Sequence, residues 1–363
     1  ESDLMKKNLT KEFFEKGQAE HTTIKLKILD SYIIPWMRKV VLSKYGSKSC
    51  CIIDTFAGAG VYSDGSIGSP IILLNEAIRF INQAKEKNFT INKILLTFIE
   101  KDANNYLQLK QNIEKIVEEE IKDAEVTNCK NYPQLFIAIE NGTHEDFLKG
   151  LTANVDNIIP TLFFMDPFGF SLPFEINKNI LSKYSNVELL INLMYEEINR
   201  FITVDSVQKK MSELFGIEDM AQIIKEIKES NKEQRQNIIK STYTDNLKNS
   251  GAKYTLDFDI HSERGQVKMS MIYATKSLEG FDTMKEALDK ISNTDRNEYI
   301  PETEEENEQI IIEGFESRIN KSQELANYLF RIAKNKEIQV RELINKAKEH
   351  PTIPSNYTKK ALM

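Results

Sequence analysis

The stretch over residues 52–60, Ile-Ile-Asp-Thr-Phe-Ala-Gly-Ala-Gly, constrains the fold of this chain more than any other. Small and apolar residues begin at Ser49, and this apolar run ends at Asp54. The stretch therefore predicts a buried parallel strand that turns sharply into a glycine loop. Glycine adopts backbone angles that side chains forbid, and it lets a ligand approach the main chain closely. The glycine spacing differs from the G-x-G-x-x-G fingerprint of dinucleotide-binding proteins.

Helical and strand-like stretches alternate through the first half of the chain. Apolar residues at helical spacing predict helices over 20–45, 70–85 and 106–122. Short apolar runs predict strands over 50–54, 95–100, 135–140, 161–165 and 187–194. This alternation is typical of βαβ units, in which helices cover both faces of a parallel sheet. Two later runs, 254–260 and 267–275, flank a short polar segment with Gly265 and predict an antiparallel hairpin.

Three acidic residues end predicted strands, where ligands of open α/β sheets bind. Asp54 ends the first strand, Glu100 the second and Asp166 the fourth, while Thr143 and His144 follow the third. A carboxylate at Glu100 can accept both hydroxyls of a ribose, but an acid there can also cap the following helix. We expect His144 to be a surface histidine.

The segment Asp166-Pro167-Phe168-Gly169-Phe170 is the candidate reaction site. A reaction at an exocyclic amine needs an acceptor for the amine hydrogens, and Asp166 provides one. Pro167 makes the turn rigid, and an aromatic ring such as Phe168 holds a base by stacking. Such a base is flipped out or already unpaired. The alternative is a structural turn with Phe168 and Phe170 in the core.

Several motifs together resemble the three-Cys-motif partner family, TcmP. The similar segments are 54–60, 64–70, 99–102, 166–169, 190–195, 198–201 and 273–275, and the resemblance covers about 21–288. It implies a Rossmann-like class I methyltransferase fold, in which the parallel strands end in an antiparallel hairpin, and a phage- or defence-related setting. It also implies a partner, a radical-SAM-like three-Cys-motif protein whose cysteines give the family its name.

The cofactor that this resemblance implies is S-adenosylmethionine, and the candidate residues divide by role. The cofactor-binding candidates are Asp54, Phe56, Gly58, Gly60, Glu100 and Thr143. The catalytic candidates are Asp166, Pro167 and Phe168, and the substrate-binding candidates are Phe170, Tyr195, Asn199, Arg200, Lys359 and Lys360. An alternative role for Tyr195, Asn199 and Arg200 is to begin a helix that packs the cap.

Two wider resemblances concern the substrate. The Asp-x-Phe-Ala-Gly-x-Gly loop is similar to that of methyltransferases acting on adenine in DNA or rRNA. The Asp-Pro-Phe-Gly form after Asp166 instead resembles tRNA dimethylguanosine methyltransferases. Adenine and guanine, and DNA and RNA, therefore stay open.

Composition excludes several other classes of protein. Cys50, Cys51 and Cys129 lack metal-ligand spacing and fit reduced, buried thiols in a cytoplasmic protein without a metal. No apolar run approaches the roughly 20 residues of a membrane span, and residues 1–27 are charged, unlike a signal peptide. The net charge of −7 argues against a generally basic surface for nucleic acid.

Charge changes sign sharply near the end of the chain. Residues 295–316 carry net −8 and predict a solvated linker or an exposed helix start, whereas residues 321–360 carry net +5. The basic part predicts helices over 323–334, 340–348 and from 355, a spacing typical of a helix-turn-helix or winged helix. Asn356, Tyr357, Lys359 and Lys360 would then face phosphates or base edges; a dimer or partner contact is the alternative.

These patterns divide the chain into five segments. They are an N-terminal helical segment (1–48), an α/β domain (49–195 and 252–293), a helical insertion (196–251), an acidic linker (294–320) and a basic helix-turn-helix-like module (321–363). Two functions follow. One is a methyltransferase acting on an exocyclic amine of a nucleic-acid base. The other is a non-catalytic protein of the same fold that binds the radical-SAM-like partner.

Overall fold

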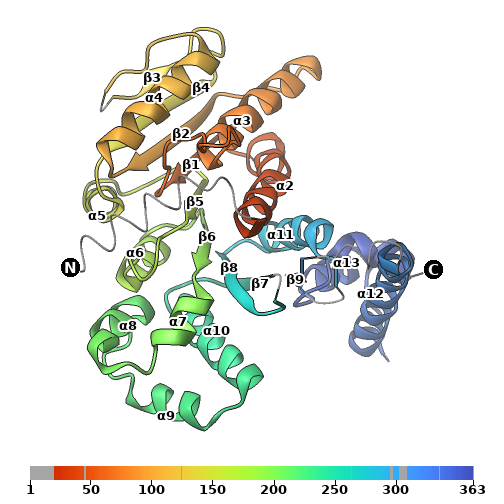
Figure 1. Cartoon of the computed structure of the whole chain (residues 1–363). Helices are drawn as coiled ribbons and strands as arrows, with labels where there is room; N and C mark the ends of the chain where they lie inside the picture. The colour runs from red at the N-terminus through yellow and green to blue at the C-terminus, as the bar shows by residue number, and fades with distance from the viewer. Residues whose placement is uncertain are drawn as a thin grey trace. The chain divides into compact units, whose positions relative to one another are not determined.

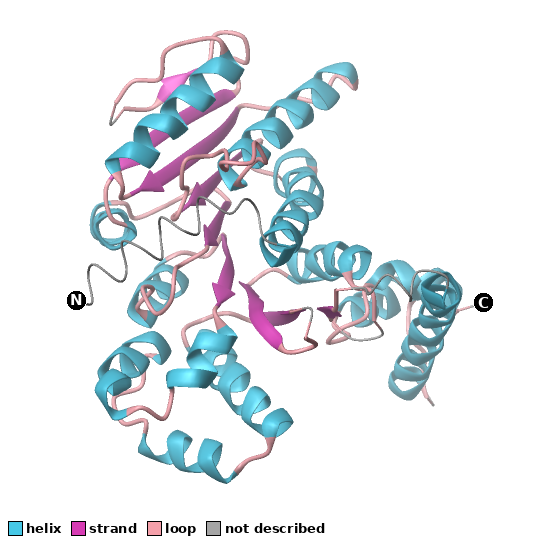
Figure 2. Ribbon diagram, in the orientation of Figure 1, coloured by secondary structure: helices cyan, strands magenta, loops and turns pink. Residues whose placement is uncertain are grey.

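The structure is a computed structural model that describes residues 20–44, 46–123, 125–262, 264–294, 297–301, 309–334 and 336–362. Side chains are described for these residues except 20 and 309–319. The chain forms two compact units, Glu1–Asp166 and Pro167–Met363. Figure 1 labels their elements, and Figure 2 distinguishes strands from helices.

The first unit is built on four parallel strands. They are β1 (Ser49–Asp54), β2 (Lys93–Glu100), β4 (Leu135–Asn141) and β5 (Thr161–Met165). Their order is β4-β2-β1-β5, and Asp54 lies opposite Phe98 of β2 and Phe164 of β5. The four strands predicted here are therefore confirmed to within two residues. The short β3 (Thr127–Asn128), antiparallel to β4, was not predicted because two residues make no pattern.

Four helices accompany these strands. They are α2 (Glu20–Leu42), α3 (Ser69–Glu86), α4 (Ala103–Val117) and α5 (His144–Asn154). Helices α2 and α3 lie side by side (Figure 1). The predicted bounds of the third helix, 106–122, are wrong at both ends. Asp102 caps α4 by accepting the backbone N–H groups of Asn104 and Asn105, and Glu118 ends it in a left-handed conformation. Residues 1–19 of the predicted N-terminal segment lie outside the described residues.

Cys50, Cys51 and Cys129 are buried free thiols, as predicted. Burial raises the pKa of Cys51 and that of Cys129 to about 12, so neither is a nucleophile at neutral pH. Within the described residues, no helix combines the length and the apolar character that crossing a membrane requires.

The second unit contains the predicted hairpin. Its strands are β6 (Val187–Leu193), β7 (Tyr254–His261), β8 (Val267–Thr275) and β9 (Glu298–Tyr299), in the order β6-β8-β7-β9. Strand β8 is antiparallel to both β6 and β7, which confirms the hairpin. Strand β9 pairs parallel with β7 inside the predicted acidic linker and was not foreseen. Residues 295–296 and 302–308 of that linker lie outside the described residues.

The insertion at 196–251 is helical, as its pattern predicted. Its elements are α7 (Tyr195–Phe201), a 3-10 turn η1 (Asp205–Val207), α8 (Gln208–Phe215), α9 (Ala221–Glu229) and α10 (Lys232–Asn249). The buried Tyr243 of α10 packs edge-on against Phe215 and against Phe174 of α6 (Phe174–Lys183). Its hydroxyl accepts a hydrogen bond from Asn177 at 2.9 Å.

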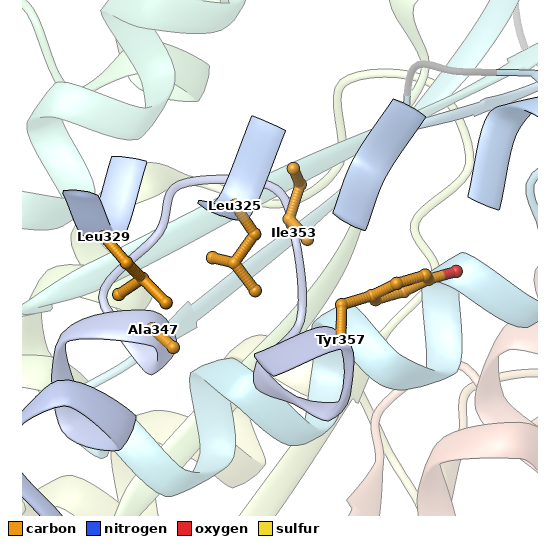
Figure 3. Close-up of a cluster of buried hydrophobic side chains, with 5 residues drawn as sticks. All are labelled: Leu325, Leu329, Ala347, Ile353 and Tyr357. Carbon is orange, nitrogen blue, oxygen red and sulfur yellow. The ribbon is translucent and has the colours of Figure 1, made fainter. Parts of the chain in front are cut away.

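The C-terminal helices enclose a small core of their own. The elements are α12 (Gln309–Ala333), α13 (Val340–Lys348), a 3-10 turn η2 (Ser355–Tyr357) and α14 (Thr358–Ala361). Figure 3 shows the buried cluster of this C-terminal module, formed by Leu325, Leu329, Ala347, Ile353 and Tyr357. The expectation that Tyr357 faces nucleic acid is wrong, because its ring lies in this core and its hydroxyl donates to Asp289 at 2.9 Å.

A buried lysine fastens this module to α11 (Leu278–Ile291). The Lys285 ammonium donates to the carbonyls of Lys348, His350 and Ile353, each at 2.9 Å. A lysine is seldom fully buried unless its charge is paired, and here three carbonyls and Asp282 at 3.4 Å surround it. The basic module is thus attached by specific polar contacts within the second unit.

Candidate functional site

Three carboxylates lie at the same edge of the first unit. Asp54 is the last residue of β1, Glu100 is the last of β2, and Asp166 directly follows β5. These strands are neighbours in the order β2-β1-β5, and all three are parallel. Their carboxyl ends therefore meet at one edge, which brings together the three acids that the sequence singled out.

Asp54 is the central and most deeply buried of the three. Its Oδ1 accepts the backbone N–H of Phe56 at 3.2 Å, whereas its Oδ2 is buried without a hydrogen bond of ordinary geometry to any described residue. Burial raises the pKa of Asp54 to about 7, and repulsion from Asp166 and Glu100 adds to the rise. Hydrogen bonding by the Ser69 side chain and the Phe56 amide lowers the pKa and so limits this rise. A buried acceptor of this kind suits a cationic or N–H-bearing ligand.

The glycine loop is anchored to the strands on either side of β1. The Thr55 amide donates to the Phe164 carbonyl at 3.1 Å, and the Ala57 amide donates to the Ile99 carbonyl at 3.0 Å. Gly58 and Gly60 have φ angles of +63° and +78°, which explains why glycine occupies both positions. The amide of Gly58 donates to Glu100 Oε2 at 2.8 Å. The loop and the second acid thus form one hydrogen-bonded unit.

The two glycines differ in what surrounds them. A Cβ at Gly58 would meet no atom within 4 Å, so this face of the loop is open. A Cβ at Gly60 would lie 2.9 Å from Leu109 and 3.3 Å from Ile71. Gly60 therefore serves close packing of the loop against α3 and α4, whereas Gly58 leaves room for a ligand.

Glu100 is not the cap of the helix that follows it, because Asp102 holds that position. Its Oε1 accepts the Asp102 amide at 2.7 Å, and its Oε2 accepts that of Gly58. Burial raises the pKa of Glu100. Each carboxylate oxygen has two lone pairs, so the two amide bonds still leave acceptor capacity for hydroxyl groups of a ligand.

Thr143 caps α5 within the same edge. Its hydroxyl oxygen accepts the Asp146 amide at 3.0 Å, and its hydrogen goes to Asp146 Oδ2 at 2.6 Å. The side chain is thereby committed to the helix. His144 begins α5, and its ring centroid lies 4.4 Å from that of Phe56, so it contacts the glycine loop rather than standing alone on the surface.

Asp166 forms an ion pair with a residue that sequence reasoning missed. Lys25 of α2 places its Nζ on Asp166 Oδ2, and both side chains are largely buried. A signal was present, because Lys25 stands one turn before Ile28 and Leu29 on the buried face of α2. A charged residue at such a position requires a partner.

The remaining residues of the Asp-Pro-Phe-Gly segment belong to the second unit. Pro167 is buried, whereas the Phe168 side chain is 56 % exposed, so it is not a core residue. Gly169 has a φ angle of +61°. The ring of Phe170 packs edge-on against Phe201 of α7, with 6.1 Å between centroids.

The other substrate-binding candidates also lie in the second unit. Tyr195 is buried at the start of α7, and Asn199 has a buried Oδ1 without a hydrogen bond to any described residue. Arg200 is exposed and lies over the Phe201 ring at 5.3 Å. Lys359 and Lys360 are exposed on α14, at the surface of the C-terminal module.

Parallel strands followed by an antiparallel hairpin, with helices between them, form a mixed α/β, Rossmann-like fold. No protein-family model matches the sequence, and no curated protein matches it.

Solved structures with distant similarity include three methyltransferases, each with S-adenosylmethionine or SAH bound. Trm1 from Pyrococcus horikoshii with S-adenosyl-L-methionine is 12 % identical with a TM-score of 0.37, over 72 % of this chain and 58 % of that chain. The present chain thus spans less than two-thirds of Trm1. An O-methyltransferase from Bacillus cereus in complex with SAH is 11 % identical with a TM-score of 0.35, over 76 % of this chain and 90 % of that chain. The O-methyltransferase TomG from Streptomyces achromogenes with SAM is 9 % identical with a TM-score of 0.34, over 72 % of this chain and 91 % of that chain.

Proposed function

We propose that this chain is an S-adenosylmethionine-dependent methyltransferase that acts on an exocyclic amino group of a nucleic-acid base. The observation that carries the proposal is the row of Asp54, Glu100 and Asp166 at the ends of adjacent strands, beside an open glycine loop. Carboxylates that repel one another raise the free energy of the fold. A purely structural protein has no physical need for such a cluster, whereas a protein that binds a ligand with cationic and hydroxyl groups does.

The residues present fit S-adenosylmethionine. The orphaned Oδ2 of Asp54 suits the ammonium of the amino-acid end, and the open face at Gly58 allows close approach to the backbone. Glu100 suits the ribose hydroxyls, and the Phe56 and His144 rings provide an apolar surface for the adenine. Thr143 then contributes by fixing the start of α5, since its hydroxyl is already used.

The acceptor side of the reaction falls to the segment that begins at Asp166. When bound, the cofactor supplies a methyl group activated by a sulfonium. Asp166 accepts the hydrogens of the acceptor amine, which directs the nitrogen lone pair toward the methyl group, and Pro167 limits movement of the turn. The exposed ring of Phe168 is suited to stack on an unpaired or flipped base. Catalysis is then mainly positioning.

Nucleic-acid binding would draw on exposed cations of the second unit. Arg200 on α7 and the pair Lys359 and Lys360 on α14 are solvent-exposed. Each such side chain that neutralises a phosphate makes affinity fall with salt. Adenine and guanine, in DNA or RNA, are the acceptors to be screened.

A second candidate function is a non-catalytic partner protein with the same fold. The observation that favours it is that the chain itself already occupies its key acids: Lys25 pairs with Asp166, and both oxygens of Glu100 hold backbone amides. The resemblance to TcmP proteins would make the partner a radical-SAM-like three-Cys-motif protein. This alternative expects stable co-purification and no methyl transfer.

Calorimetric titration of S-adenosylmethionine and S-adenosylhomocysteine into the intact chain separates the two. We expect micromolar binding that is lost in Glu100→Ala and Gly58→Val. Gly65→Val is the matched control, because Gly65 also has a positive φ and open surroundings. Transfer of labelled methyl groups to single-stranded DNA, tRNA and rRNA, with Asp166→Asn as the inactive variant, then identifies the acceptor. No binding, with or without nucleic acid, would contradict the enzyme proposal and favour the partner protein.

A further inference from the structure

Lys25 is the most deeply buried cation next to the candidate site. The residue is 6 % exposed, and its ammonium contacts Asp166 Oδ2 across 141 residues of sequence. Burial of a lysine without a partner costs several kcal/mol. A buried lysine at this position therefore destabilises the fold unless its charge is paired. Its partner is Asp166, the acid assigned to the acceptor amine.

The charges around this pair explain why a cation is needed. The charged groups at this edge of the first unit include Lys25 from α2, Asp54 from β1, Glu100 from β2, Asp102 before α4 and Asp166 after β5. His144 enters from α5 and contacts Phe56. Asp54, close to Asp166 and Glu100, takes up a proton near neutral pH. Asp166 sits in the same anionic surroundings but has an ammonium on one oxygen.

We propose that Lys25 is a positioning residue of the site, which fixes the orientation of the Asp166 carboxylate for the acceptor amine. The proposal rests on the proposed function, because it deepens the role given to Asp166. A carboxylate accepts hydrogen bonds through its two oxygens, so its use to the acceptor amine depends on where those oxygens point.

The ion pair also fixes geometry. Asp166 is the last residue of the first unit and lies beyond the end of β5. The ammonium of Lys25 comes from α2, a helix of 23 residues whose buried face packs within the same unit. One carboxylate oxygen is thus held by a rigid element, and the carboxylate is oriented before a substrate arrives. Preorganisation of this kind lowers the cost of aligning reacting groups.

The test compares Lys25→Met and Lys25→Gln with Lys25→Arg, which keeps the charge. Lys27→Met is the matched control, because Lys27 is an exposed lysine on the same helix. The first readout is the position of the Asp166 carboxylate in crystal structures of the variants. We expect the carboxylate to leave its wild-type rotamer in the two neutral variants, because no ammonium then holds one of its oxygens. It should keep the wild-type rotamer in Lys25→Arg and Lys27→Met.

The second readout is methyl transfer to the nucleic acid that the screen identifies. The kcat should fall by about tenfold or more in Lys25→Gln while the Kd for S-adenosylmethionine stays unchanged, and it should return with Lys25→Arg. Circular dichroism shows whether each variant is folded, and Lys25→Gln decides the matter if Lys25→Met is not.

Two results would overturn the inference. One is an Asp166 carboxylate that keeps its wild-type rotamer when Lys25 is neutralised. The other is about tenfold weaker S-adenosylmethionine binding in Lys25→Gln with kcat unchanged, which would assign Lys25 to the carboxylate of the cofactor. Absence of turnover in the intact chain overturns the proposed function alone, since the position of the Asp166 carboxylate is determined without turnover.

Discussion

Alanine substitutions at three glycines separate backbone strain from packing and from ligand binding. Gly58, Gly60 and Gly65 all have positive φ angles, of +63°, +78° and +84°. Placing alanine in this region costs about 1–2 kcal/mol for the backbone alone. The smaller entropy of the unfolded alanine chain returns about 0.4–1 kcal/mol. We therefore expect Gly58→Ala and Gly65→Ala each to lower the free energy of unfolding by about 1 kcal/mol.

Gly60→Ala carries an additional cost. Its Cβ would lie 2.9 Å from Leu109 Cδ1 and 3.3 Å from two atoms of Ile71. Both residues are buried, on α4 and α3, so neither can move away freely. Overpacking of this kind costs about 1–3 kcal/mol, and the total for Gly60→Ala becomes roughly 2–4 kcal/mol.

Urea unfolding of the four proteins, monitored by circular dichroism, measures these differences, and calorimetry measures cofactor binding on the same samples. Gly58→Ala should weaken S-adenosylmethionine binding by about tenfold or more, since its methyl group enters the open face of the loop. Gly65→Ala should leave binding unchanged. The packing argument is refuted if Gly60→Ala costs no more than Gly65→Ala. The ligand argument is refuted if Gly58→Ala and Gly65→Ala bind the cofactor alike.

Three further predictions concern ionisable groups. Because the pKa of Asp54 is raised to about 7, cofactor binding should weaken about tenfold per pH unit below that value, and Asp54→Asn should flatten the dependence in calorimetric titrations. Burial lowers the pKa of His350 to about 4, helped by Lys285 and Arg331, so the folded state binds fewer protons than the unfolded state between about pH 4 and 6.5. Acidification through that window should cost roughly 3 kcal/mol of unfolding free energy, less in His350→Asn, as pH-dependent denaturation will show. Lys285→Met removes the donor to three carbonyls and should destabilise the C-terminal module by about 3 kcal/mol, visible as faster hydrogen exchange over α13; unchanged exchange would contradict it.

Local patterns predicted most of the elements because each pattern depends only on neighbours in sequence. The strand over 161–165 and the hairpin strand over 267–275 were predicted to the residue. Errors arose where an end is set by a single cap, as at Asp102 and Glu118 of α4. The two-residue strands β3 and β9 escaped detection, because their only support is pairing with distant strands.

The candidate site likewise has a part that sequence patterns predicted and a part that they did not. A glycine loop and acids at strand ends are readable from sequence, since the carboxyl ends of parallel strands meet at one edge. The sequence by itself thus determined the fold class and the positions of Asp54, Glu100 and Asp166. Two interpretations of Glu100, ribose binding and helix capping, stayed open, and only the hydrogen bond from Gly58 and the cap at Asp102 distinguished them.

Only the tertiary structure decided which groups neutralise one another. Lys25 and Asp166 are 141 positions apart, and Lys285 holds carbonyls 63 or more positions away. A local pattern can show that a buried lysine needs a partner but not which residue that partner is, because the energy of an ion pair depends on distance and burial rather than on sequence spacing. Tertiary packing likewise placed Tyr357 in a core while leaving its neighbours Lys359 and Lys360 exposed.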